Sequence, residues 1–191
     1  RAFVRHSAGK LAVAAVPTAK AVEIIRCEGK AALVKQLRDA LLCVIERICL
    51  PRHWRFVWEL PENSLGKLTT QALEALFDPR AVQAVAVSRS AHDAELVISV
   101  PGNSPFFTGH FPEFKLLPGV VQITWAENLA RRLFGLEGCL KEIKKLKFMR
   151  PIAPESTVVL RLASDSKGTA FSYEDARGTP LAKGLLVFAG V

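Results

Sequence analysis

The segment that decides the fold is FTGHFPEFKLLPGVVQITW, residues Phe107 to Trp125. It places His110 in a loop rich in glycine and proline, and Pro118-Gly119 then opens an apolar helix predicted over Gly119–Phe134. The first N–H groups of a helix lack an acceptor inside the helix and carry the positive end of its dipole. A histidine base opposite such an end suits removal of a proton beside a carbonyl, whose oxygen becomes negative. A histidine between glycine and proline also suits a purely structural loop, which is the alternative.

This block resembles the hot-dog-fold beta-hydroxyacyl-acyl-carrier-protein dehydratases. Their signature is G-H-F-P, a short hydrophobic run, and P-G-V at the head of a buried helix. The resemblance extends from Glu95 to the C-terminus and is closest to the dehydratase-like proteins of bacterial aryl-polyene and related lipid-type gene clusters. The residues that carry it are Gly109, His110, Phe111, Pro112, Leu116, Leu117, Pro118, Gly119 and Val120.

The resemblance implies an antiparallel sheet wrapped around a central helix and a dimer with its active site at the subunit interface. It implies a 3-hydroxyacyl substrate carried on the phosphopantetheine of acyl carrier protein or on CoA, with no further cofactor and no metal. His110 corresponds to the base, and the N–H of Gly119 would polarise the thioester carbonyl. Phe107, Phe111 and Val120 are the candidates to line the acyl pocket, and core packing is the alternative for the phenylalanines.

One position departs from the family's pattern. In the dehydratases an acidic residue on the helix protonates the departing hydroxyl, and the corresponding residue here is Thr124. Glu127 lies about one helical turn further on, so it is a candidate for that role. The alternative is that Glu127 pairs with Arg131 on the helix surface, and His110 or a water held by Thr124 would then supply the proton.

The rest of the second half supports an antiparallel sheet independently of the resemblance. One strand is predicted before the histidine loop and four after the helix, with hairpin turns at 165–168 and 176–179 between the later ones. The predicted strands are Glu95–Val100, Ile143–Met149, Thr157–Ala163, Thr169–Asp175 and Leu181–Ala189. Sheets of this kind commonly pair across their edges, so a homodimer is expected.

The first half carries a second resemblance. LPRHWRFVWELPENSLGKLTTQALEALF, residues Leu50 to Phe77, is similar to the C-terminal end of AMP-forming acyl-CoA synthetases. Those enzymes end in a small mobile α+β domain whose loop lysine stabilises carboxylate and phosphate charges during adenylation. The corresponding lysine is Lys67, preceded by Pro61, Asn63 and Gly66. Since no phosphate-binding glycine motif is present, Lys67 would act only together with a missing nucleotide-binding domain.

The predicted organisation is therefore an α+β chain with a ligase-tail domain over 1–77, a linker over 78–94 and a hot-dog domain over 95–191. Within the first domain, strands are predicted at 11–16 and Arg55–Leu60. Apolar residues at spacings of three and four predict a helix over Ala31–Cys49, and a short helix capped by Thr69 or Thr70 is expected to end near Phe77. We expect the chain to be part of a longer fusion with an acyl-CoA synthetase.

Composition narrows the class. The chain has 191 residues, of which 50% are hydrophobic, and no apolar run reaches the roughly 18–20 residues that span a bilayer. The four cysteines form no metal-ligand spacing and are expected to be free, buried thiols in a reducing compartment. A cytoplasmic protein without a membrane association is predicted.

The net charge of +8 suits a nucleic-acid, anionic-lipid or acidic-protein partner, and a generically basic solvated surface is the alternative. The sequence shows no nucleic-acid-binding signature, so no nucleic-acid partner is predicted. Acyl carrier protein is acidic and agrees with the dehydratase resemblance. The basic residues gather after the long helix, at Arg131, Arg132, Lys141, Lys144, Lys145, Lys147 and Arg150.

Three functions compete. The first is a 3-hydroxyacyl-carrier-protein dehydratase of fatty-acid or polyene-type biosynthesis. The second is a thioesterase or a binding module on the same fold, which the threonine at position 124 favours. The third is a fragment of an acyl-activating ligase, with the hot-dog half as an accessory domain.

Overall fold

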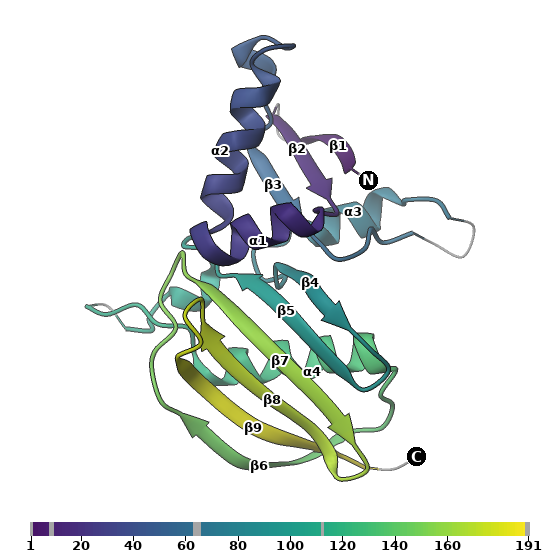
Figure 1. The fold of residues 1–191 in the computed structure, drawn as a ribbon, viewed down its shortest axis with the longest axis vertical. Helices are drawn as coiled ribbons and strands as arrows, with labels where there is room; N and C mark the ends of the chain where they lie inside the picture. Colours follow the sequence, from purple (N-terminus) through teal and green to yellow (C-terminus); the bar gives the residue numbers. More distant parts are fainter. Residues whose placement is uncertain (1, 8–9, 63–65, 112, 190–191) are drawn as a thin grey trace.

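The computed structural model describes residues 2–7, 10–62, 66–111 and 113–189. Two sheets organise these residues: a small one formed by the N-terminal third, and a larger one that curves around a single long helix (Figure 1). Pro112 of the histidine motif and Asn63 of the motif that ends at Lys67 lie outside the described residues. No helix among the described residues is both long and apolar enough to cross a membrane.

The N-terminal unit packs helices around a three-stranded sheet in the order β1-β2-β3. β2 pairs antiparallel with β1 and parallel with β3, so the helical segment between β2 and β3 makes the crossover. Thr18 caps the first helix by accepting a hydrogen bond from the N–H of Ala21. The elements are β1 (Ala2–Ser7), β2 (Lys10–Ala15), α1 (Ala19–Glu28), α2 (Lys30–Leu41), η1 (Arg47–Cys49), β3 (His53–Phe56) and α3 (Thr70–Leu76).

Two predictions for this unit are wrong in their extent. The helix predicted over Ala31–Cys49 ends at Leu41, because the apolar Val44 and Ile48 are 76% and 81% exposed and find no core to pack against. The chain turns there instead, and all four cysteines are exposed free thiols, against the prediction of buried ones. The strand predicted at Arg55–Leu60 is shorter and begins earlier, as β3.

The C-terminal unit is a six-stranded antiparallel sheet in the order β4-β5-β7-β8-β9-β6, which wraps around α4 (Gly119–Phe134) (Figure 1). Both predicted hairpin turns are confirmed, since β7 leads directly into β8 and β8 into β9. The remaining elements are β4 (Ala84–Arg89), β5 (Asp93–Ser99), η2 (Pro105–Phe107), β6 (Leu140–Phe148), β7 (Thr157–Asp165), β8 (Gly168–Asp175) and β9 (Pro180–Phe188). The predicted helix and the five predicted strands are thus present, with ends shifted by a few residues.

The segment predicted as a linker contributes to this sheet. Within 78–94, β4 forms an edge strand paired with β5 from Ala84 onward. A linker is predicted here because the apolar run is short, and periodicity over so few residues does not distinguish a buried strand from a loop. The stretch without regular structure between α3 and β4 is therefore confined to residues 77–83.

The larger sheet has apolar cores on both faces where β4, β5 and β7 meet the N-terminal unit. On the inner face Leu96, Ile98 and Leu160 pack with α4. On the outer face the alternate residues Val97 and Val159 pack with α1, because successive side chains of a strand point to opposite sides. The N-terminal unit thus covers part of the outer face of the hot-dog sheet, over β4, β5 and β7, rather than lying apart from it.

An ion-pair chain reinforces this contact at the edge of the shared core. Arg26 of α1 lies 3.3 Å from the carboxylate of Glu95 on β5. The same carboxylate pairs with Arg161 on β7, whose Nε lies 3.3 Å from Glu174 on β8. Since the Glu95 side chain is largely buried, these charges fix the position of α1 on the sheet.

Candidate functional site

The loop before α4 holds His110 by its main chain. The N–H of His110 donates to the carbonyl of Phe107 at 3.4 Å, and its own carbonyl accepts from the N–H of Leu116 at 3.1 Å. Gly109 before it has φ +76°, a conformation that side-chain-bearing residues rarely adopt, which explains the glycine of the motif. The half-buried imidazole stacks on the ring of Phe111, with centroids 4.8 Å apart.

The N-terminus of α4 presents backbone N–H groups that have no acceptor within the helix. Pro118 is the N-cap, and its carbonyl accepts the first helical hydrogen bonds, from the N–H groups of Val121 and Gln122. The N–H groups of Gly119 and Val120 precede these bonds and have no acceptor within the helix. The N–H of Gly119 is the donor that the sequence predicts for a developing oxyanion.

Two buried polar side chains fix the geometry of this turn. Gln122 donates from Nε2 to the carbonyl of Leu117 at 3.0 Å, and the hydroxyl of Tyr173 donates to the carbonyl of Gln122 at 2.8 Å. The N–H of Leu117 in turn donates to the carbonyl of Ile152. Burial raises the pKa of Tyr173 well above its usual range, so its hydroxyl is a permanent donor. Sequence reasoning missed both residues, since a polar residue in an apolar helix or strand carries no positional signal of its own.

Phe148, at the end of β6, lies directly over the helix start. A Cβ built on Gly119 would stand 2.6 Å from the tip of the Phe148 ring, so only glycine permits this close approach. The ring is half exposed. The helix terminus is therefore covered on one side by an aromatic ring that sequence analysis did not assign to the site.

The two candidate proton donors on α4 are both engaged. The exposed hydroxyl of Thr124 donates to the carbonyl of Val120 at 2.9 Å. Oε1 of Glu127 accepts a hydrogen bond from Nε of Arg131 at 2.9 Å, and Nη2 of Arg131 also lies 2.9 Å from this oxygen. The ion pair considered as the alternative for Glu127 is thus formed in the structure.

The residues predicted to line an acyl pocket do not share one environment. Phe107 is buried in the hydrophobic core, whereas Phe111 and Val120 are exposed beside the histidine loop and at the first turn of α4. Phe114 on the histidine loop and Phe148 and Met149 at the end of the edge strand β6 are exposed apolar side chains as well, and the Phe148 ring lies beside the helix start. An apolar surface of this kind at a sheet edge is typical of an interface with another chain.

Lys67 lies apart from this site. It is exposed, in the connection between β3 and α3, next to the bridge that joins Glu62 and Leu68. The structure therefore does not bring the two predicted site motifs together. Among the described residues, no three histidine, cysteine, aspartate or glutamate side chains gather as metal ligands would.

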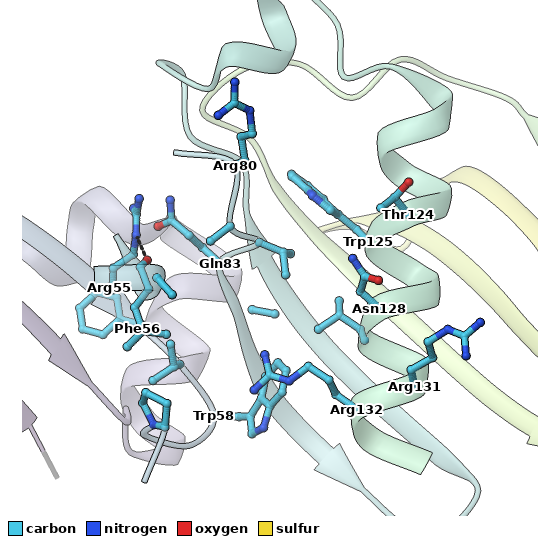
Figure 2. Close-up of a pocket in the computed structure, with 18 of the residues that line it drawn as sticks. Arg55, Phe56, Trp58, Arg80, Gln83, Thr124, Trp125, Asn128, Arg131 and Arg132 are labelled. Atoms are coloured by element: carbon cyan, nitrogen blue, oxygen red, sulfur yellow. Dashed lines mark hydrogen bonds between the residues drawn. The ribbon is translucent and has the colours of Figure 1, made fainter. Parts of the chain in front are cut away.

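A cavity of about 830 Å³ lies between the two units, next to α4 (Figure 2). Val120 and Thr124 contribute to its wall, and so do residues of β3 and α3 from the N-terminal unit. Sequence reasoning did not predict it, because its wall depends on how two separately recognised segments pack.

A sheet wrapped around one central helix, with a histidine loop leading into that helix, defines a hot-dog protein. Residues 86–185 match the ApeI-like family, described as ApeI dehydratase, and the chain belongs to this family. The dehydratase heterocomplex ApeI:P from Xenorhabdus doucetiae has the same fold, with a TM-score of 0.51 and 26% identity over 56% of this chain and 98% of that one.

Curated relatives match less than half of the chain. The 3-hydroxyacyl-[acyl-carrier-protein] dehydratase FabZ of Chlamydia muridarum is 32% identical over 102 residues, which are 45% of this chain and 65% of that protein. The FabZ of a Wolbachia species from Drosophila simulans is 36% identical over 70 residues, 33% of this chain and 49% of that protein. The chain thus spans less than two thirds of the length of these relatives.

Proposed function

We propose that the C-terminal unit removes water from a 3-hydroxyacyl thioester held on acyl carrier protein. The observation that carries the proposal is the position of His110, which follows Gly109 in the loop that leads into α4 and its free N–H groups. The chain belongs to the ApeI-like dehydratase family, which supports the same activity. The relatives named 3-hydroxyacyl-[acyl-carrier-protein] dehydratase support the choice of substrate class.

In the proposed reaction His110 takes the proton from the carbon next to the thioester carbonyl. The carbonyl oxygen gains negative charge and is stabilised by the N–H of Gly119 and the helix dipole. The C–O bond to the hydroxyl then breaks, a carbon–carbon double bond forms, and the leaving oxygen takes up a proton to depart as water. General acid–base catalysis of this kind contributes roughly 10²–10⁴-fold to a rate.

Of the three proton donors considered, we propose His110 itself. The carboxylate of Glu127 is held by Arg131, and the Thr124 hydroxyl donates to the helix carbonyl before it. The imidazolium that forms in the first step carries the proton that the second step needs. A single residue then acts as base and as acid, which accounts for the absence of a carboxylate at position 124.

A rate comparison tests this assignment. Purified chain is mixed with 3-hydroxyacyl-carrier protein, and formation of the unsaturated thioester is followed by absorbance. His110→Ala is expected to lower the rate at least about 100-fold, while Thr124→Ala and Glu127→Gln each stay within a few-fold. A loss in Glu127→Gln equal to that in His110→Ala would show that Glu127 is the acid.

The proposed partners follow from the surface. A homodimer through the apolar surface around β6 would bring a second copy next to each helix start, and a heterocomplex is the alternative because the related ApeI:P assembly is one. The basic residues on and after α4 suit an acidic carrier protein. We expect the carrier to supply the phosphopantetheine arm, with no further cofactor, and we expect these steps to take place in the cytoplasm.

For the N-terminal unit we propose the role of the C-terminal domain of an AMP-forming acyl-CoA synthetase. The loop motif around Lys67, its exposed position between β3 and α3, and the α+β arrangement support this. Lys67 would reach a nucleotide only in the presence of a nucleotide-binding unit. Adenylate formation by such a unit, measured with this chain and with its Lys67→Ala variant, tests the proposal, and equal rates would contradict it.

A further inference from the structure

The basic residues on and after α4 differ in whether their charge is compensated within the chain. On α4 itself, Arg131 pairs with Glu127 at 2.9 Å. Arg132 lies 3.9 Å from Glu59, and its guanidinium lies over the ring of Trp58. Both arginines of the helix are therefore engaged, and the cations that remain available to another molecule lie on the strands after it.

Three lysines of β6 and β9 have no such partner. Lys145, Lys147 and Lys183 are exposed. In the part of the chain that the structure describes, no carboxylate lies within ion-pair distance of any of them. Lys144 beside them pairs with Glu142 at 3.2 Å. The two strands therefore carry positive charge that the chain itself does not compensate.

A β-bulge places these lysines on one face of the sheet. Lys144 is opposite Leu185 and Lys147 is opposite Lys183, so β6 has one residue more than β9 between these two pairs. Lys145 lies in this bulge with φ +53°. It contributes to the same groove as Lys183, although a regular strand would direct successive side chains to opposite faces.

The face that carries the lysines is the outer face of the hot-dog sheet. Lys183 is opposite Ser172 on β8, and Ser172 is opposite Arg161 on β7. Arg161 is two residues from Val159, which packs against the N-terminal unit on the outer face. In Figure 1, β9 and β6 lie at the end of the sheet away from that unit, which leaves the lysines accessible.

A groove of about 600 Å³ crosses this face. Lys145 and Lys183 contribute to its wall from β6 and β9, and Asp93 and Glu95 contribute from β5. Three strand spacings separate β5 from β9, which is about 14 Å. This separation exceeds the screening length of roughly 8 Å at physiological ionic strength. The two carboxylates therefore do not neutralise the lysines.

The opposed pair of Lys147 and Lys183 has an energetic consequence. Like charges directly opposite each other on neighbouring strands destabilise a sheet. A partner that places carboxylates beside the two ammonium groups relieves this repulsion, so the pair favours an anionic partner. A groove with polar walls fits a protruding segment of an acidic protein better than it fits the flat surface of a bilayer.

We propose that the outer face of β9 and β6 is the docking surface for acyl carrier protein, with Lys145, Lys147 and Lys183 contacting its carboxylates. The identity of the partner rests on the proposed function, whereas the position of the surface rests on the uncompensated lysines. Phe148 follows Lys147 in β6, and its ring lies over the helix start. A carrier docked here therefore holds its acyl group near the loop of the proposed base.

A binding titration tests the docking surface. The full chain is titrated with carrier protein that bears its phosphopantetheine arm and no acyl group, and binding is followed by calorimetry. Lys147→Gln/Lys183→Gln should raise Kd at least about fivefold, because two charge contacts are lost. Lys20→Gln/Lys35→Gln is the matched control, since it removes two exposed lysines of α1 and α2, and it should bind as the unmodified chain does.

A second readout separates recognition from a general loss of folding. Lys183→Gln removes the repulsion with Lys147, so it should raise Tm by about 1–3 °C while it weakens carrier binding. At about 1 M salt, where the screening length is roughly 3 Å, both differences from the unmodified chain should disappear. A lower Tm for Lys183→Gln would contradict the role of the opposed pair.

The binding results decide the proposal without any turnover. Absence of carrier binding, equal binding by the Lys147→Gln/Lys183→Gln variant, or an equal loss in the control variant would overturn the docking surface. Tighter binding of phosphatidylserine vesicles or of double-stranded DNA than of carrier protein would overturn the choice of partner. His110→Ala should bind the carrier as the unmodified chain does, so a failure of dehydration contradicts the proposed function and leaves the lysine dependence of binding to be judged by itself.

Discussion

Removing one side chain of α1 should destabilise the whole chain rather than the N-terminal unit alone. Ile25 is 1% exposed and belongs to the core that α1 shares with Val97 and Val159 on the outer face of the hot-dog sheet. Truncating a buried isoleucine to alanine costs about 2–5 kcal/mol, through lost apolar burial and the cavity that remains. Because this core joins both units, the loss should appear in a single unfolding transition.

The assay is urea unfolding of Ile25→Ala, followed by far-ultraviolet circular dichroism and by tryptophan fluorescence. Both signals should shift together, because Trp54 lies in the shared core and Trp125 lies on the other side of the sheet. Ile48→Ala is the matched control, since Ile48 is largely exposed, and it should change stability by less than about 0.5 kcal/mol. Two separate transitions, with only the first one shifted in Ile25→Ala, would refute the shared core.

Three further predictions concern single groups. Burial lowers the pKa of Lys30 to about 8 from 10.5, so the unfolded chain binds more protons between these pH values. The free energy of unfolding relative to Lys30→Met should therefore rise by up to about 3 kcal/mol from pH 7.5 to 10.5, and an unchanged difference would contradict the burial. Gly168→Ala should lower the free energy of unfolding by at least about 1–3 kcal/mol. The added Cβ would lie 2.3 Å from the carbonyl oxygen of Leu186, and φ at this position is +138°. Gly178→Ala, with φ +81° and open space around it, should cost less in the same thermal unfolding assay. Tyr173→Phe should cost about 0.5–1.5 kcal/mol by removing the hydrogen bond to the Gln122 carbonyl, and a neutral effect would show that this bond does not hold the helix start.

The hot-dog half was largely predictable because its signals are local. The Pro118-Gly119 start, the apolar positions of α4 and the hairpin turns each specify an element within a few residues. The edge strand β4 escaped prediction because its short apolar run becomes a strand only through pairing with β5. The helix predicted to Cys49 shows the opposite error, since apolar spacing continues beyond Leu41 where no core is available.

The candidate site was predictable in its motif residues and not in its surroundings. His110 and Gly119 stand in a recognisable pattern, and the positive φ of Gly109 explains why the pattern needs a glycine. Phe148 over the helix start depends on a contact distant in sequence, and so do Trp58 and Gln83 in the cavity wall. A single sequence gives no signal for such contacts. The pairing of Glu127 with Arg131, by contrast, follows from their spacing of four on a helix and was expected as one of two alternatives.

The most direct test of the central claim is the mass of a 3-hydroxyacyl-carrier protein before and after incubation with this chain, beside His110→Ala. The account predicts that the acyl-carrier protein loses the mass of one water with the unmodified chain and keeps its mass with the variant. Release of the free acid, or loss of water at the same rate in His110→Ala, would contradict dehydration by His110.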